Sequence, residues 1–246
     1  MPDNRWPGGA EVRPLVIIPT YNERDNLPVV VEALLRVPDV RILVVDDGSP
    51  DGTGEVADEL SSRARARVSV LHRRGPRGFG LSLIDGMRWA LATDATVICH
   101  MDADLSHDPT DVPRLAAGTS EADLVIGSRY VPGGRIDNWP RRRVLLSAFA
   151  NRYVRAILGL PVMDCTSGFR CWRRDALERL PLERIRSNGY AFQVEMTWEA
   201  LAASCRITEV PITFVERQQG ASKLSSGIIV ESAILPWRLA LGRPRR

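Results

Sequence analysis

Two carboxylates separated by a single residue are the first feature of the sequence that could do chemistry. Asp102 and Asp104 flank Ala103 directly after a short apolar run. Side chains alternate along an extended chain, so both carboxylates would point to the same side. Hard oxygen ligands of this kind suit Mg²⁺ or Mn²⁺ bound together with substrate phosphates. The alternative is a helix N-cap, in which Asp104 or Ser106 starts a helix near Pro109.

Two earlier polar segments also end apolar runs, namely PTYNE at 19–23 and DDGSPDGT at 46–53. Each could simply be a turn followed by a capped helix, because Asp, Gly, Ser and Pro are turn residues for physical reasons. If all three acidic segments end strands of one sheet, however, their carboxylates converge on one crevice and repel. A cation or the hydroxyls of a sugar would relieve that repulsion, which turn chemistry alone does not explain.

The elements that must position these residues alternate in type along the first half of the chain. Continuous β-branched runs are typical of strands buried on both faces, and helical spacing at 24–36 and 81–92 falls between them. This alternation predicts an α/β fold with a mostly parallel sheet and helices on both faces. Ligands of such sheets bind beyond the carboxyl ends of the strands, where the polar segments fall. The expected strands are 15–18, 42–45, 68–71, 96–99 and 124–126.

The second half has a looser pattern. Residues 207–215 read as a strand broken by Pro211, and no linker separates a second domain, so we expect 1–246 to form a single domain. The expected helices are 141–158, 190–203 and 228–241.

Composition and motifs exclude several functions. The 246 residues are 44% hydrophobic and carry a net charge of +3, which does not indicate a nucleic-acid partner. The only lysine, Lys223, follows Ser222, so a phosphate-binding P-loop is absent; neither GxSxG nor HExxH occurs. We expect the histidines at 72 and 100 to be structural. The four cysteines show no paired or metal-finger spacing, and no signal peptide or apolar span is present, which favours a reduced cytoplasmic setting.

Together these motifs resemble glycosyltransferase family 2 and, within it, the polyprenol- or dolichol-phosphate mannose synthases. The resemblance covers nearly the whole chain and implies a GT-A fold, with inverting transfer of mannose from GDP-mannose to a polyprenyl phosphate. The motifs that carry it are PTYNE (19–23), VDDGSPDGT (45–53), MDADLSHDP (101–109), GSRYVPGG (127–134), TSGFR (166–170), GYAFQVE (189–195) and PITFVERQQGASKL (211–224).

The resemblance also implies roles for individual residues. Asp104 would ligate the Mg²⁺ or Mn²⁺ that bridges the donor phosphates, with Asp102 and Ala103 contacting the donor. Ser106 stands where some relatives carry glutamine, which puts a second ligand there in doubt. The nucleotide would be held by Pro19, Tyr21, Glu23, Val45 and Asp47, and the phosphates by Arg129, Arg217 and Lys223.

The expected chemistry agrees with these residue types. A lipid phosphate is already ionised at neutral pH, so it needs no strong general base, and charge stabilisation becomes the main catalytic requirement. The residues 141–143, all arginine, could form an entrance patch. Lys223 is the one basic residue that is not arginine, which favours a tight phosphate contact there. Gln193 and Glu195 could face the acceptor or merely start a helix.

The acceptor is a membrane lipid, yet no segment is long enough to span a bilayer. We expect residues 228–246 to form an interfacial amphipathic helix with a basic tail, with core packing as the alternative; Arg152 and Arg155 could add a basic face. This predicts a peripheral protein at the cytoplasmic face of the membrane. A separate membrane subunit is among the partners that the resemblance implies. The competing functions are a UDP-glucose-dependent transferase on the same acceptor and a non-catalytic subunit of a membrane complex.

Overall fold

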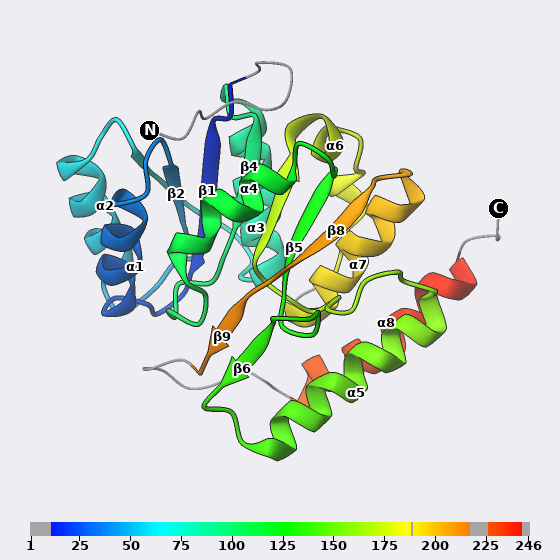
Figure 1. Ribbon diagram of the computed structural model, residues 1–246. Coiled ribbons are helices and arrows are strands. Elements are labelled where there is room, and N and C mark those ends of the chain that lie inside the picture. The colour runs from blue at the N-terminus through cyan, green and yellow to red at the C-terminus, as the bar shows by residue number, and fades with distance from the viewer. Residues whose placement is uncertain (1–10, 188, 217–225, 243–246) are drawn as a thin grey trace.

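The computed structural model describes residues 11–187, 189–216 and 226–242, without the side chains of 226–232. Its central feature is a seven-stranded sheet in the order β3-β2-β1-β4-β7-β5-β8 (Figure 1). The strands are β1 (Pro14–Thr20), β2 (Arg41–Asp46), β3 (Val68–His72), β4 (Val97–His100), β5 (Leu124–Ser128), β7 (Arg170–Arg173) and β8 (Ile207–Pro211). All five strands expected in the first half are confirmed.

One strand of the sheet runs against the others. β7 pairs antiparallel with β4 and β5, whereas the remaining strand pairs of this sheet are parallel. The pairing sets Cys171 opposite Cys99, and a disulfide joins them across a sequence separation of 72 residues. The expectation of reduced cysteines differs from the structure here, because strand register rather than sequence spacing brings this pair together. Cys165 and Cys205 are free and buried.

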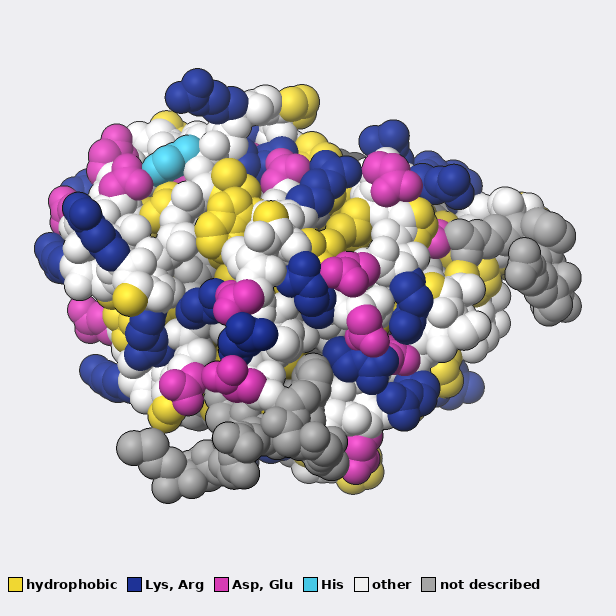
Figure 2. Space-filling model, turned by 90° about the horizontal axis from the view of Figure 1, so that it is seen from above, with side chains coloured by type: hydrophobic (Ala, Val, Ile, Leu, Met, Phe, Trp, Pro, Cys, Tyr) yellow, Lys and Arg dark blue, Asp and Glu magenta, His cyan; other side chains and the backbone are white. Residues whose placement is uncertain are grey.

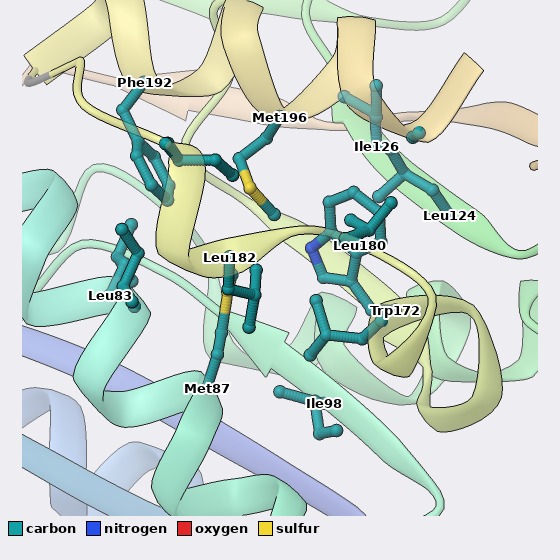
Figure 3. Packing of buried hydrophobic residues seen from close by; sticks show 14 of the residues in the cluster. Leu83, Met87, Ile98, Leu124, Ile126, Trp172, Leu180, Leu182, Phe192 and Met196 are labelled. Atoms are coloured by element: carbon teal, nitrogen blue, oxygen red, sulfur yellow. The ribbon is translucent and has the colours of Figure 1, made fainter. Parts of the chain in front are cut away.

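Helices cover both faces of the sheet (Figure 1). Alternate side chains of each strand enter two separate hydrophobic layers, so that Ile17 packs on one face and Val16 on the other. Figure 3 shows the first layer, where Leu83 and Phe192 from two helices lie on one side of Met196 and Trp172 lies on the other, beside Leu180. The helices are α1 (Asn26–Leu35), α2 (Thr53–Arg63), α3 (Phe79–Leu91), α4 (Val112–Gly118), α5 (Arg141–Leu158), α6 (Arg174–Glu178), α7 (Gly189–Ala202) and α8 (Ser226–Gly242), with 3₁₀ turns at Pro109–Asp111 and Leu182–Arg184.

The predicted break at Pro211 is confirmed. β8 ends at this residue, and the chain then enters β9 (Thr213–Val215), which pairs in a separate two-stranded sheet with β6 (Arg135–Asp137). Proline has no N–H to donate, so it does not continue a strand ladder on that side. The change of sheet carries β9 toward the carboxyl ends of β4 and β5, where it helps to form the site described below.

The surface carries both signs of charge. On the face shown in Figure 2, basic and acidic side chains are interspersed rather than gathered into a patch of one sign. Within the described part of the chain, no helix is both long and apolar enough to cross a membrane.

Candidate active site

A cavity lies at the carboxyl ends of β4 and β5. It combines three of the predicted site residues, Asp102, Asp104 and Arg129, which come from two separate strand ends. The other described residues that line it are Trp139, Arg143, Thr166, Gly168, Tyr190 and Phe214. The other described residues predicted for the site lie at the carboxyl ends of β1 and β2 and do not line this cavity, apart from Ala103, which lies between Asp102 and Asp104.

The turn after β4 holds the two carboxylates in place. Asp104 is buried, and its Oδ1 accepts hydrogen bonds from the backbone N–H and the hydroxyl of Ser106, at 3.1 and 2.5 Å. Leu105 has a φ of 62°, a left-handed conformation that lets Ser106 fold back onto Asp104. A Cβ at Gly168 would lie 3.1 Å from a carboxylate oxygen of Asp102, so glycine leaves room for this side chain. Ser106 thus orients the carboxylate next to it.

The donor set fits a divalent cation that is shared with a ligand. Asp102 and Asp104 supply hard carboxylate oxygens on one cavity wall. No cluster of three or more His, Cys, Asp or Glu side chains that could hold a metal occurs among the residues described. Mg²⁺ and similar ions commonly take one or two carboxylates and complete their coordination with phosphates and water.

Two buried histidines lie beside this wall but are not suited to proton transfer. His107 accepts a hydrogen bond at its Nδ1 from the Asp102 backbone N–H, at 3.4 Å, and its ring packs against Phe214. Burial lowers the pKa of His107 to about 4. Burial, with the charge of Arg170, lowers the pKa of His100 to about 3. Both imidazoles are therefore neutral at physiological pH.

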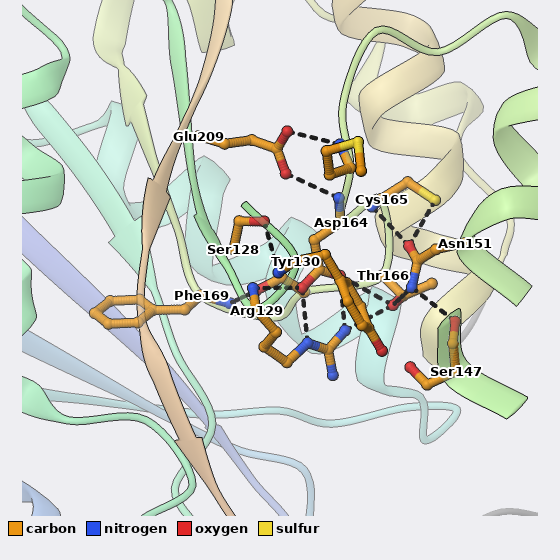
Figure 4. A network of polar contacts seen from close by, with 12 residues as sticks. Ser128, Arg129, Tyr130, Ser147, Asn151, Asp164, Cys165, Thr166, Phe169 and Glu209 are labelled. Carbon is orange, nitrogen blue, oxygen red and sulfur yellow. Dashed lines mark hydrogen bonds and ion pairs between the residues drawn. The ribbon is translucent and has the colours of Figure 1, made fainter. Parts of the chain in front are cut away.

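Arg129 has a partner that the sequence did not reveal. Its Nε and Nη2 donate to the two carboxylate oxygens of Asp164, both at 2.7 Å, and Nη2 also donates to Thr166 (Figure 4). Burial alone would raise the pKa of Asp164, but the charge and hydrogen bonds of Arg129 outweigh it and hold that pKa below its usual value. Arg129 thus lines the cavity as one half of a buried ion pair.

A second buried arginine shapes the segment before β7. Arg170 donates to the carbonyl oxygens of Cys165, Ser167 and Gln193 and to the hydroxyl of Thr197. These bonds tie the strand entrance, which includes the cavity residues Thr166 and Gly168, to α7. The motif TSGFR was noticed in the sequence, but its arginine was given no role. Nothing local in the sequence marks this arginine as buried, because two of its acceptors, the Gln193 carbonyl and the Thr197 hydroxyl, come from the distant α7.

Aromatic rings and a third arginine close the cavity. The guanidinium of Arg143 lies 3.9 Å from the ring centre of Trp139, and its Nη1 pairs with Glu216 at 2.9 Å. The rings of Trp139 and Phe214 meet edge to face at 5.3 Å. Of the predicted arginine patch, Arg143 is the member that lines the cavity, whereas the residues at 141 and 142 are exposed.

The predicted nucleotide residues lie at the carboxyl ends of β1 and β2. Asp47 is buried; it forms a short ion pair with Arg73 and accepts a hydrogen bond from the Gly78 backbone N–H at 2.7 Å. The expected repulsion between carboxylates is therefore relieved at Asp47 by an internal arginine. Asp46 accepts hydrogen bonds from the backbone and hydroxyl of Ser49, as the turn alternative predicted.

The remaining nucleotide residues differ in accessibility. The side chain of Val45 is fully buried in the hydrophobic layer, and its carbonyl accepts a hydrogen bond from the Thr20 hydroxyl at 3.3 Å. Pro19 and Tyr21 are half-buried, and Tyr21 accepts a short hydrogen bond from Arg77. Glu23 accepts a hydrogen bond from Asn26 at 2.8 Å.

The other predicted positions are settled differently. Glu195 is buried and accepts hydrogen bonds from the backbone N–H groups of Arg186 and Ser187, which holds the segment that leads into α7. This bonding favours the helix-start alternative for Glu195. Gln193 is buried on the same helix. Arg217 and Lys223 lie outside the described residues.

Comparisons with known proteins agree with this architecture. The family model for glycosyl transferase family 2 matches residues 15–181. The chain is 48% identical to polyprenol monophosphomannose synthase of Mycolicibacterium smegmatis, covering 94% of this chain and 91% of the relative. It is 47% identical to undecaprenyl-phosphate mannosyltransferase of Micrococcus luteus, covering 93% and 95%.

Solved structures show the same fold. Glucosyl-3-phosphoglycerate synthase from Mycobacterium tuberculosis, crystallised with Mn²⁺, UDP and phosphoglyceric acid, has a TM-score of 0.68 at 20% identity, covering 95% of this chain and 80% of that one. The mannosyltransferase PcManGT from Pyrobaculum calidifontis, in complex with GDP-Man and Mn²⁺, has a TM-score of 0.57 at 17% identity, covering 94% and 73%. The GT-A fold expected from the sequence is confirmed. With an α/β sheet of this topology and a family model that spans most of the sheet, the chain belongs to glycosyl transferase family 2.

Proposed function

We propose that this chain transfers mannose from GDP-mannose, with inversion, to the phosphate of a polyprenyl phosphate. The observation that carries the proposal is the cavity that places Asp102 and Asp104 together with the cations of Arg129 and Arg143. A reaction between an anionic donor and an anionic acceptor needs both kinds of group in one place. The names of the two relatives at 47% and 48% identity support mannose and a polyprenyl phosphate.

The chemistry requires alignment and charge compensation more than proton transfer. A phosphate oxygen of the acceptor attacks the anomeric carbon as the bond from that carbon to the GDP oxygen breaks, and GDP leaves with the electron pair. The attacking phosphate is already ionised at neutral pH, so no proton has to be removed. Among the described residues that line the cavity, only Asp102 and Asp104 are bases, which fits a reaction without a dedicated general base. Arg143, which stacks on Trp139 and pairs with Glu216, would hold the acceptor phosphate.

Asp104 and Asp102 would hold the Mg²⁺ or Mn²⁺. When bound, the ion supplies positive charge to the departing diphosphate. Ser106 keeps the Asp104 carboxylate oriented for this task through its two hydrogen bonds. Arg217 and Lys223, predicted from the sequence, remain candidates for further phosphate contacts.

A transfer assay tests the donor and the acceptor together. Purified protein, Mg²⁺ or Mn²⁺ and a short polyprenyl phosphate would be offered labelled GDP-mannose or UDP-glucose in parallel, and label counted in the organic phase. We expect metal-dependent transfer from GDP-mannose to exceed that from UDP-glucose by more than about 100-fold, since a site built to hydrogen-bond one base rejects another. Preference for UDP-glucose would contradict the proposal that GDP-mannose is the donor. Label from neither donor, with folded protein and membranes supplied, would favour a non-catalytic subunit of a membrane complex.

A lipid acceptor also requires contact with a membrane, and α5 and α8 present the surface for it. Six large apolar side chains on these helices are exposed: Leu145, Leu146, Phe149, Ile234, Trp237 and Leu241. The two helices lie side by side (Figure 1), where Tyr153 donates to the Ala233 carbonyl and accepts a hydrogen bond from Trp237. Phe149 stacks on Tyr153 within α5 at 6.4 Å, and Tyr153 contacts Trp237 of α8, so the apolar surface continues from one helix to the other.

This surface fits the headgroup layer of an anionic bilayer. Exposed arginines at 141, 142 and 152 flank the apolar residues of α5, which is the pattern of a helix that lies in a membrane interface. The cavity is close to the same helix, because Arg143 in its first turn lines it. We therefore propose that the protein binds peripherally to the cytoplasmic face of the membrane through α5 and α8, alone or with a membrane subunit.

Replacing Leu146 and Phe149 together by Asp tests this surface. Both side chains are about two-thirds exposed, at 67% and 66%, so the folded protein should tolerate the change. Burying each in a bilayer stabilises binding by about 2 kcal/mol, and we expect liposome binding to fall by more than about tenfold. The matched control is Val29→Asp, which is 51% exposed on α1. Unchanged sedimentation with vesicles of anionic lipid would contradict the assignment.

A further inference from the structure

The loop 73–78, which follows β3, is fixed at both ends by a single carboxylate. Arg73, the first residue of the loop, forms an ion pair with the Asp47 carboxylate. The backbone N–H of Gly78, the last residue, donates a hydrogen bond to the same carboxylate. Arg73 also pairs with Asp85 at 2.7 Å and donates to the Pro76 carbonyl at 3.3 Å. The backbone of the loop is therefore held against the carboxyl end of β2. This fixes the position of the backbone from which the next side chain extends to Tyr21.

That side chain is Arg77. Its Nη1 donates to the hydroxyl of Tyr21, and its guanidinium carbon lies 4.8 Å from the centre of the tyrosine ring. Arg77 is exposed, and it forms no ion pair with a carboxylate of the described residues. An arginine that contacts a tyrosine ring and pairs with no described carboxylate keeps its remaining N–H groups to offer to a ligand.

We propose that Arg77, supported by Tyr21, reads the N7 and O6 edge of the guanine base and so selects a guanine nucleotide over a uracil nucleotide. The inference rests on the proposed function, in which the donor is GDP-mannose. In sheets of this kind a nucleotide lies at the carboxyl ends of the strands, where Tyr21 and the loop 73–78 meet.

The chemistry of the bases explains the selection. Guanine presents two adjacent acceptors, N7 and O6, which match the two-pronged N–H geometry of arginine. Adenine presents one acceptor and one donor on the same edge. Uracil has no N7, and its O4 lies beside an N–H donor. A lysine at position 77 would keep the charge and lose the fork.

The test is the affinity of the purified chain for GDP, 7-deaza-GDP and UDP in the presence of Mg²⁺, measured by calorimetry. In 7-deaza-GDP a C–H group replaces N7, so the analogue removes one acceptor and leaves the diphosphate intact. We expect wild type to bind GDP about tenfold more tightly than 7-deaza-GDP. Arg77→Lys should lower the affinity for GDP by about tenfold. Its affinities for 7-deaza-GDP and UDP should stay within about twofold of the wild-type values. Arg74→Lys, on the same loop and exposed, is the matched control and should change nothing.

The other outcomes overturn the inference in distinguishable ways. Equal loss of GDP and UDP affinity in Arg77→Lys would place the arginine on the diphosphate instead of the base. An unchanged GDP affinity in Arg77→Lys would show that Arg77 does not contact the nucleotide. It would leave the proposal of GDP-mannose as the donor unaffected. Failure of the wild-type chain to bind GDP, with UDP bound normally, would overturn the donor and the guanine contact together.

Discussion

Asp104→Asn should lower kcat/KM for mannose transfer by at least about 100-fold without unfolding the protein. The amide oxygen can still accept the hydrogen bonds that Ser106 donates, so the turn after β4 keeps its shape. The amide carries no charge, however, and binds a divalent cation far more weakly than a carboxylate. Losing the positive charge at the departing diphosphate costs several kcal/mol of transition-state stabilisation. Initial rates over a range of Mn²⁺ concentrations would measure the loss.

The matched control for this change is Asp108→Asn. Asp108 is exposed and caps the turn at Pro109–Asp111 by accepting from Thr110, a role that asparagine also fills. We expect its rate to stay within about twofold of wild type, since Asn and Asp cap almost equally well. High Mn²⁺ should recover part of the activity of Asp104→Asn. Full activity in Asp104→Asn at low metal would remove this carboxylate from the proposed metal site.

The parallel part of the fold could be predicted because its signals are local. Continuous β-branched runs marked β1 to β5, and helical periodicity marked α5 at the residues observed. β7 was missed because its four residues, from Arg170 to Arg173, begin and end with arginine and show no apolar alternation. What makes it a strand is non-local: Arg170 is fully buried because α7 and the preceding segment supply its acceptors.

The residues of the candidate site could be predicted from their types and positions, but their ion-pair partners could not. Asp102, Asp104 and Arg129 do share one cavity, because β4 and β5 both flank β7 and end at the same edge of the sheet. Two pairings could not be read from the chain. Asp164 is 35 residues from Arg129, and Arg73 is 26 residues from Asp47, so neither ion pair leaves a mark at short range. In the sequence the charges of Arg129 and Asp47 look available to a ligand. In the structure Asp164 and Arg73 compensate them.

Asp164→Ala should destabilise the protein by about 3–5 kcal/mol, because it leaves the charge of Arg129 buried and uncompensated. The side chains of Arg129 and Asp164 are 4% and 0% exposed, so the ion pair is almost completely removed from solvent. For a chain of this length the loss corresponds to a fall in Tm of about 10 °C, which calorimetry would show. The control is Glu59→Gln, which breaks the exposed pair with Arg63 and should cost less than about 1 kcal/mol. An equal, small effect of both changes would contradict a buried ion pair.

The pH dependence has a definite sign. The pKa of Asp164 is lower in the folded chain than its usual value, so its contribution to stability is present above about pH 4 and is lost as the pH falls toward the folded pKa. Wild type should therefore lose more stability than Asp164→Ala on acidification below about pH 4, and the two should differ by a constant amount between about pH 5 and 8. A difference that stayed the same below about pH 4, or that kept growing above about pH 5, would contradict this assignment.

The double variant Arg129→Met with Asp164→Leu separates structure from catalysis. Replacing a buried ion pair by apolar groups of similar size is often neutral or stabilising, so the double variant should recover most of the Tm that Asp164→Ala loses. It also removes a guanidinium from the wall that carries Asp102 and Asp104. If Arg129 stabilises the anionic reactants, the folded double variant should transfer mannose at least about 100-fold more slowly. If it transfers at the wild-type rate, Arg129 only positions Asp164 and Thr166, and the compensating charge must come from Arg143 and its neighbours.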